Sequence, residues 1–441
     1  MSVRHRLPWT PRAASAAAVA LAFSAPMAAA QVSAPTSSGS PGAADPNPYY
    51  VGISQALTHD SNVFRIPSGT GDNYSSTSLF GGFDQPISRQ RLFGRGAVTA
   101  NRYQDQDQLN NVSYNLGAGL DWQTIERLSG NVNLGLNRSL ATPTASGGIP
   151  SSTRNVASTT SADAKVRWGG ASILTLEGGL GYSKLDYSSP QYASSESSHT
   201  TESLGLYYRP GGPLRLGVAA RVDQTRTPKA FVDPATGATR PTTVEGRNID
   251  FSADYDLTGL LAANGRVSYT RQKNSGISNA DFSGLTGSAA LNWRATGKIS
   301  VRLDAAREAG FDTAAYSSFA FTPGPNGIVL TPVTGLYENN RVTNSVGVGA
   351  DYAATAKISA TASARYSRAR LSTVDSATAS VRPGGDVTDV SKIFTLGVNY
   401  AVARNWGAGC NLGHEGRDVS GATSFAYTAN TIGCSTQFTW R

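Results

Sequence analysis

Three groups of side chains in this 441-residue sequence could carry chemistry: a few histidines, two cysteines, and a series of alternating carboxylates and guanidiniums. Beyond the N-terminal segment the histidines are His59, His199 and His414, which lie far apart in the sequence. The sequence contains no HExxH metal motif, no GxSxG nucleophile elbow and no phosphate-binding P-loop. A hydrolase would need histidine, carboxylate and serine together at one rim, and no motif brings them together. We therefore expect no enzyme activity, no catalytic residue, no cofactor and no metal site.

The acidic residues Asp250, Asp254 and Asp256 are separated by even numbers of positions, so in a β-strand they share one face. Arg221 and Arg266 lie in the segments before and after that strand. Two interpretations stay open. In the first, these charges form ion pairs between neighbouring strands and only stabilise the wall of a sheet. In the second, they form a polar ladder that guides a hydroxylated or anionic polymer, with the basic residues in contact with acidic sugars.

The two cysteines, Cys410 and Cys434, fall on the last two expected strands, around a loop centred near 420–422. Antiparallel pairing about that centre can place them opposite each other, on the face that also carries Trp406 and Trp440. A disulfide closing this hairpin would stabilise the fold by roughly 3 kcal/mol in the chain-entropy model. The alternative is two reduced cysteines that act as small hydrophobic residues against lipid.

The elements that must position these residues are short segments in which apolar and small polar residues alternate. Val346, Val348 and Ala350 alternate with serine and glycine, and similar segments recur from Tyr49 to Arg441. A period of two predicts strands with one apolar and one polar face, and a closed sheet of such strands suits a bilayer. The candidate strands are 49–57, 72–84, 89–103, 109–122, 128–140, 154–168, 172–186, 196–209, 213–227, 244–258, 260–272, 280–294, 297–309, 338–353, 356–370, 385–401, 405–416 and 423–440. The sequence therefore predicts an all-β fold, a transmembrane antiparallel up-and-down β-barrel of about 18 strands, with 16 as the alternative.

The connections between these strands alternate in length. Tight turns are expected at 86–88, 169–170, 210–212, 258–259, 296–297 and 403–404, and longer polar loops at 58–71, 141–153, 228–243, 310–337 and 371–384. Short periplasmic turns and long extracellular loops are typical of outer-membrane barrels, and an even strand count leaves both termini in the periplasm. The proline-containing loop 310–337 is long enough to fold into the lumen, so we expect it to form the constriction.

Aromatic residues gather at the expected strand ends. Those beside the tight turns predict a periplasmic girdle: Trp122, Trp168, Tyr208, Trp293, Tyr352, Tyr400, Trp406 and Trp440. Those toward the long loops are candidates for a second girdle: Tyr103, Tyr182, Tyr187, Tyr269, Tyr366 and Tyr427. A soluble β-sandwich is the alternative, but it gives no reason for tryptophans to collect beside short turns.

Charged residues inside the strands should point into the lumen, because an arginine facing lipid near the bilayer midplane costs about 2–4 kcal/mol. The expected lumen-lining residues are Arg95, Lys165, Arg167, Arg215, Arg221, Asp250, Asp254, Asp256, Arg266, Arg302, Asp304 and Arg365. Their neighbours in sequence are mostly apolar, as residues of the opposite face should be. We expect a wet lumen of mixed charge.

The first 30 residues have the features of an export signal: three arginines, an apolar run over 13–24, and alanines at 28–30. Residues 31–48 predict a flexible periplasmic linker, and 49–441 the barrel. The formal net charge is +8, and three of these charges belong to the signal, which leaves +5. This mild charge and the expected export argue against a nucleic-acid partner.

The opening of the barrel resembles a known family. The segment Thr58-His59-Asp60-Ser61-Asn62-Val63-Phe64-Arg65, with Gly52-Ile53-Ser54 before it, is similar to the start of the β-barrel porin-2 family, the EpsL-like outer-membrane proteins of exopolysaccharide operons. Arg89-Gln90-Arg91, Ala100-Asn101-Arg102-Tyr103, Leu120-Asp121-Trp122 and Glu126-Arg127-Leu128-Ser129-Gly130 look like the early hairpins of that family. The motif-like part covers roughly residues 49–140. Within it, we interpret Asp60, Ser61 and Asn62 first as a structural turn.

The resemblance implies an outer-membrane conduit for a secreted exopolysaccharide. Its partners would then be outer-membrane lipid, the polysaccharide, and a periplasmic polysaccharide-export protein that lacks its own membrane-spanning part. The expected location is the outer membrane of a Gram-negative cell. Two other functions stay open, because a fold alone does not fix a function. They are a diffusion porin for small solutes and a structural or adhesive surface barrel.

Overall fold

The computed structural model describes residues 48–125, 127–141, 154–169, 172–232, 239–257, 259–275, 281–324, 327–375, 380–381, 387–420 and 426–441. The expected export signal over 1–30 and nearly all of the expected linker over 31–48 lie outside the described residues. Within the described residues, no helix is long and apolar enough to cross a membrane.

Almost all of the described chain is β-strand. The strands are β1 (Tyr49–Asp60), β2 (Asp72–Ile87), β3 (Gln90–Tyr103), β4 (Asn111–Gln123), β5 (Leu128–Leu140), β6 (Val156–Trp168), β7 (Leu174–Tyr187), β8 (Ser197–Tyr208), β9 (Leu214–Val232), β10 (Thr239–Leu257), β11 (Leu261–Asn274), β12 (Phe282–Arg294), β13 (Ile299–Gly324), β14 (Gly327–Ala353), β15 (Ile358–Asp375), β16 (Ser380–Val381), β17 (Val387–Ala403), β18 (Trp406–Ser420) and β19 (Tyr427–Trp440). Two 3₁₀ turns lie in connections, η1 (Asp107–Leu109) after β3 and η2 (Pro190–Ser195) after β7.

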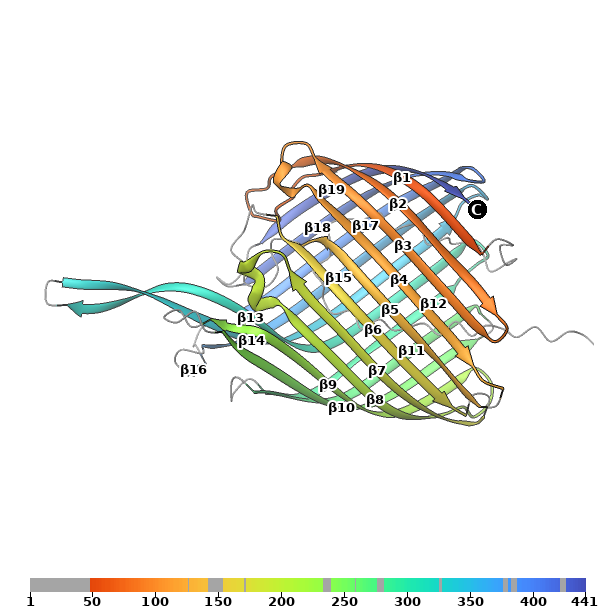
Figure 1. The fold of residues 1–441 in the computed structure, drawn as a ribbon, viewed down its shortest axis with the longest axis horizontal. Coiled ribbons are helices and arrows are strands. Elements are labelled where there is room, and N and C mark those ends of the chain that lie inside the picture. Colours follow the sequence, from red (N-terminus) through yellow and green to blue (C-terminus); the bar gives the residue numbers. More distant parts are fainter. Residues whose placement is uncertain are drawn as a thin grey trace, which may run out of the picture.

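These strands form one closed antiparallel barrel (Figure 1). Successive strands pair with each other, and β1 pairs with β19 from Val51↔Trp440 to Asp60↔Thr431, which closes the sheet. The two-residue β16 pairs only with the end of β15, and β15 pairs directly with β17, so 18 strands make the wall. The predicted fold class is confirmed, and closure leaves no unpaired strand edge in the wall.

The longest connection differs from its prediction. Residues 310–337 were expected to form a loop inside the lumen, but this prediction is wrong because they continue β13 and β14 as a long hairpin. The pairing runs without a break from Ile299↔Tyr352 to Gly324↔Gly327. Figure 1 shows this hairpin projecting far beyond the barrel, at the end opposite the C-terminus. Its sequence around 328–331 (Ile-Val-Leu-Thr) has high β-propensity, which favours strands over a loop.

The two faces of the wall differ as a membrane requires. Large apolar side chains lie on the convex outer face with high exposure, as at Leu79, Leu180 and Val346. The residues between them are polar or small and face the lumen, and most are half-buried by their neighbours. So much exposed apolar surface would make a soluble protein aggregate, whereas hydrocarbon covers it without cost.

The register separates the two predicted girdles. Trp168, Trp293 and Trp440 point outward beside the short turns, as the periplasmic girdle requires. The second girdle is only partly as expected: Tyr182, Tyr269 and Tyr366 point outward, whereas Tyr103, Tyr187 and Tyr427 point into the lumen. The prediction for these three is wrong because each differs in parity from the outward residues of its own strand.

Cys410 and Cys434 are joined in a disulfide with an Sγ–Sγ distance of 2.15 Å. They are direct partners in the β18–β19 register, and their Cα atoms lie 4.1 Å apart. Both are exposed on the outer face, where the sequence placed them with Trp406 and Trp440. The structure therefore contains the disulfide and not the alternative of two reduced cysteines.

Candidate functional site: the lumen and its extracellular mouth

The strand registers place all twelve expected lumen-lining residues on the inner face. They lie on seven of the wall strands: Arg95 on β3, Lys165 and Arg167 on β6, Arg215 and Arg221 on β9, Asp250, Asp254 and Asp256 on β10, Arg266 on β11, Arg302 and Asp304 on β13, and Arg365 on β15. The even spacing within β9, β10 and β13 is what puts each set on one face. What these residues do depends on which of them find partners.

One ion-pair ladder crosses β6 to β10. The carboxylate of Glu177 accepts from Arg167 Nε at 2.8 Å and from Arg215 at 3.1 Å. Arg215 also lies 3.5 Å from Asp254 and places its guanidinium 3.8 Å from the centre of the Tyr207 ring. Tyr207 belongs to β8, which lies between β7 and β9, so the ring bridges the gap that the ion pairs span. The ladder thereby neutralises several lumen charges within the wall.

A second ladder lies toward the extracellular end of β9 to β11. Arg221 donates to Asp250 at 2.8 Å and also pairs with Asp223 on its own strand. Asn248 donates to the Asp223 carboxylate at 2.6 Å, and Thr270 donates to Asn248 at 2.7 Å. Charge-assisted hydrogen bonds in a partly dry wall are strong, so this ladder fixes the register of three strands.

A third pair, Asp304–Arg365, crosses an intervening strand. Asp304 lies on β13 and Arg365 on β15, and both are register partners of Gly347 on β14. Their side chains meet at 2.9 Å above that glycine. A Cβ at position 347 would lie 2.5 Å from an Asp304 carboxylate oxygen, so only glycine leaves room for the crossing.

Several lumen cations have no acidic partner. Within the described residues, no ion pair involves Arg95, Lys165, Arg266 or Arg302, although Arg302 donates to Asn292 at 3.1 Å. The Nε of Arg266 is buried without a hydrogen bond to any described residue. The lumen therefore has ladders that neutralise themselves and, beside them, cations outside these ladders, of which Arg95, Lys165 and Arg302 are not fully buried.

The connection from β1 to β2 folds onto the inner wall at the extracellular end. Arg65 is 3% exposed, and its guanidinium bonds both oxygens of Asp60 at 2.9 and 2.8 Å and Glu415 at 3.0 Å. Tyr427 donates to the other Glu415 oxygen at 2.6 Å. Asn62 donates to the Thr428 carbonyl oxygen at 3.0 Å. This seam cluster (Asp60, Asn62, Arg65, Glu415, Tyr427) ties β1 to β18 and β19, where the barrel closes.

Arg65 is held in an unusual backbone conformation with φ of 54°. A left-handed arginine is uncommon and persists only where its surroundings hold it in place. Desolvation by burial lowers the pKa of its guanidinium, but Asp60 and Glu415 outweigh this and raise the pKa above its ordinary value. A turn at Asp60, Ser61 and Asn62 was expected from the sequence. The ion pair of Arg65 with Glu415, 350 positions away, was not expected.

Two further connections lie at the same end. The buried Asp72 carboxylate accepts from the backbone N–H groups of Asp105 and Gln106, which anchors the segment that contains η1. After β7, η2 packs against β9 and β13, and its Tyr192 is buried. No long loop was expected at 188–196, and Pro190 at the start of η2 is the signal for it in the sequence. Among the described connections, β1–β2 and η2 pack against the wall at the extracellular end, whereas the 310–337 segment projects away from it (Figure 1).

The histidines do not assemble a catalytic site in the described part of the chain. His199 faces the lumen, where its ring nitrogens lie 3.0 Å from Thr225 and 2.9 Å from Thr201. His59 and His414 point to the outer face, away from it. Within the described residues, no group of three or more histidine, cysteine, aspartate and glutamate side chains could hold a metal.

Comparison with known proteins places the fold. No family model and no curated protein matches the sequence. Among solved structures, OccK1 (OpdK) of Pseudomonas aeruginosa has a TM-score of 0.45 and 10% identity, with 89% of this chain and 99% of that chain covered. The siderophore receptor PirA of Acinetobacter baumannii has a TM-score of 0.43 and 7% identity, with 90% and 81% covered. The ferric enterobactin receptor PfeA of Pseudomonas aeruginosa, in complex with BCV-L6, has a TM-score of 0.41 and 10% identity, with 88% of this chain and 81% of that chain covered.

The chain is a closed antiparallel β-barrel with an apolar outer face. Identities near 10% and TM-scores below 0.5 say nothing about the function of this chain. A proposal about its function therefore rests on its own sequence and its own lumen.

Proposed function

We propose that this barrel is an outer-membrane conduit for a secreted exopolysaccharide, and that it acts with a periplasmic polysaccharide-export protein. The resemblance of residues 49–140 to the EpsL-like family suggests the class of cargo. A wall of 18 strands is wide enough to enclose an aqueous path. The remaining support comes from how the lumen charges are arranged.

The observation that carries the proposal is the division of lumen charges into paired and unpaired sets. Arg167, Arg215 and Arg221 are bound to carboxylates in the wall, so they are poor ligands for a passing molecule. Arg95 and Lys165 form no ion pair with a described residue; the register partners of Arg95 are Gly82 and Gly117, and those of Lys165 are Asn131 and Gly179, so small neighbours leave both cations accessible. Such a surface suits a polymer with many hydroxyls and occasional acidic sugars, which many weak contacts can hold and release.

The narrowed mouth also favours an export conduit over a diffusion porin. A diffusion porin conducts small solutes at all times, and its opposite charges face each other across the opening as separate rows. Here the opposite charges meet along the wall, and the β1–β2 connection and η2 pack against the wall at the extracellular end. A conduit that opens only with its partner and cargo would keep such a mouth narrow at rest.

The decisive experiment is a clean deletion in the native host, with secreted and periplasmic polysaccharide quantified separately. We expect the secreted polymer to be lost and then restored by the intact gene. Normal secretion with slower uptake of a small solute would reject the export proposal and favour the diffusion porin. If secretion and uptake are both normal, the structural or adhesive alternative is favoured.

A second experiment tests the lumen cations in the complemented strain. Arg95→Gln with Lys165→Gln should lower secretion of an acidic polymer several-fold while the barrel is present at normal abundance. The matched control is Lys298→Gln with Lys357→Gln, which removes the same charge at exposed periplasmic turns and should not change secretion. Equal secretion by both double variants would show that these two cations do not contact the cargo.

A further inference from the structure

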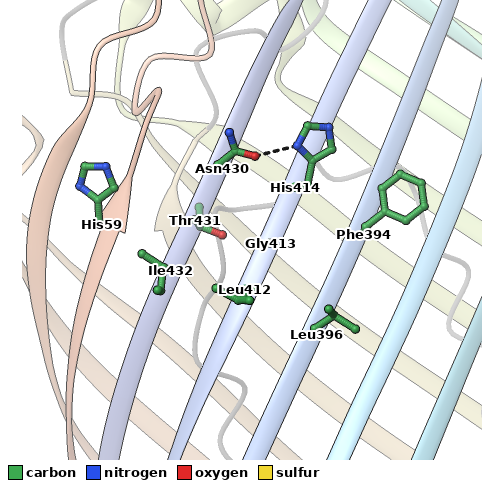
Figure 2. Close-up of a pocket in the computed structure, with 9 residues that line it drawn as sticks. All are labelled: His59, Phe394, Leu396, Leu412, Gly413, His414, Asn430, Thr431 and Ile432. Atoms are coloured by element: carbon green, nitrogen blue, oxygen red, sulfur yellow. Dashed lines mark hydrogen bonds between the residues drawn. The ribbon is translucent and has the colours of Figure 1, made fainter.

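The outer wall over β17, β18, β19 and β1 has a hollow in its extracellular half. Phe394 and Leu396 form one side, Ile432 the other, and Leu412 lies between them (Figure 2). Each of these four side chains is about half exposed, and the hollow measures about 350 Å³. It opens to the outside of the barrel, where the membrane lies, and is separate from the lumen.

The extracellular edge of the hollow is polar. His414 lies above Leu412 on β18, and its Nδ1 is 2.7 Å from the Asn430 side-chain oxygen, as Figure 2 shows. His59 at the far edge lies 2.9 Å from Asn73 in the same manner. Below this level the lining is apolar, so the hollow has one hydrocarbon-like end and one end suited to a headgroup.

A basic patch lies beside that polar edge. Lys392 is two residues above Phe394 on β17 and on the same face. Its register partner on β15 is Tyr366, so the outward-facing Arg368 is its diagonal neighbour and Arg370 follows one step higher. From the other side, Arg307 on β13 donates to Asn344 at 3.0 Å, and Asn344 is the register partner of Arg368. Four cations thus converge at the upper edge of the apolar wall.

These cations are largely uncompensated. No described residue forms an ion pair or hydrogen bond with the side chain of Arg368 or Arg370. Among the described residues, Asp418 is the one acid that pairs with the patch, at 3.1 Å from Lys392. Exposed arginines that lie together without acids repel one another. A bound anion would reduce this repulsion.

We propose that this lipid patch (Phe394, Leu396, Leu412 and Ile432 with Arg307, Arg368, Arg370 and Lys392) binds a phosphorylated, multiply acylated glycolipid of the outer leaflet. One acyl chain occupies the hollow, and a phosphate of the headgroup contacts Arg368 and Arg370. Surrounding lipid is as apolar as the hollow, so the hollow supplies shape and the arginines supply selectivity. Arginine is the favoured residue for such a contact because its fork matches two phosphate oxygens.

A second copy of this chain is the competing occupant of the same face. A second copy would place its own set of these cations against the first set at the same height. Asp418 is the only acid among the described residues that pairs with either set. Like charges placed together across an interface oppose association. The lipid phosphate has the opposite charge at that height and removes this repulsion.

The test uses the purified full-length barrel in detergent and diphosphorylated lipid A as the probe, with binding measured by native mass spectrometry and by titration. We expect about one tightly held lipid, and much weaker binding of the same lipid after its phosphates are removed. Arg368→Gln with Arg370→Gln should weaken binding at least tenfold, because each surface cation contributes roughly fivefold. The control, Lys298→Gln with Lys357→Gln at the periplasmic turns, should change it less than twofold.

The hollow is tested separately with Leu412→Trp, which fills it, against Leu285→Trp, at an exposed outward leucine on β12. We expect only the first to lower lipid retention. Equal binding of the dephosphorylated lipid would overturn the proposal. An equal loss of lipid binding in the double arginine variant and the double lysine variant would also overturn it. A stable dimer of the lipid-free barrel that Leu412→Trp dissociates would assign the patch to a second copy instead.

Discussion

The connections β1–β2 and β13–β14 are both long, yet one folds onto the inner wall and the other projects from the barrel. In residues 61–71, Asn62, Phe64 and Arg65 are buried, and hydrogen bonds tie Asn62 to β19 and Arg65 to β18. The two strands of the β13–β14 hairpin pair with each other residue by residue up to Gly324↔Gly327. The difference shows that length does not decide whether a connection enters the lumen. Buried polar contacts with the wall decide it.

The strongest test of the inward connection is Arg65→Ala. Removing the guanidinium leaves Asp60 and Glu415 buried near each other without a cation, and breaking a buried pair in this way costs about 3–5 kcal/mol. We expect the unfolding midpoint in urea to fall and the extracellular mouth to conduct more ions in a planar bilayer. The matched control is Arg91→Ala, whose pair with Asp84 is half exposed and should cost at most about 1 kcal/mol. Equal loss of stability in the two variants would show that burial of the seam cluster is unimportant.

The disulfide should come next in size. Cys410→Ser with Cys434→Ser removes a covalent link whose residues are 24 positions apart, and the expected loss is about 3 kcal/mol. Because both cysteines face outward, conductance should not change. Reduction of the wild-type protein should reproduce the loss in the urea midpoint, while the double variant should not respond to reductant. A response of the double variant would place the effect elsewhere.

Much of this architecture could be predicted, because it depends on periodicity within single strands. Within 214–222, apolar residues at the even positions alternate with inward residues that include Arg215 and Arg221. This alternation predicts the strand and also which residues lie on each of its faces. The crossing pair Asp304–Arg365 could not be predicted, since it needs the register of three strands and the absence of a side chain at Gly347. Contacts between distant segments, such as that of Arg65 with Glu415, leave no mark in local sequence patterns.

Gly347→Ala tests that crossing at a smaller scale. Its Cβ would clash with the Asp304 carboxylate, push it from Arg365 and leave both charges without their partner. We expect a loss of about 1–2 kcal/mol, as for a half-buried charged hydrogen bond. Gly349→Ala is the matched control, because it lies on the same face of β14 and its Cβ would meet nothing closer than 3.9 Å. An unfolding midpoint equal in the two variants would mean that the crossing contributes nothing.

The outward hairpin should give the smallest effect on the barrel. Residues 311–340 can be replaced by Asn-Gly, because Gly310 and Arg341 are register partners and a two-residue type I′ turn joins such a pair. All pairings lost lie within the hairpin or at the end of β15, above the wall, so we expect the urea midpoint to change by less than about 1 kcal/mol. Conductance should stay the same, because inward connections and not this hairpin narrow the mouth. A large rise in conductance would restore the constriction role that the sequence suggested for 310–337, and it would mean that the hairpin folds back over the mouth.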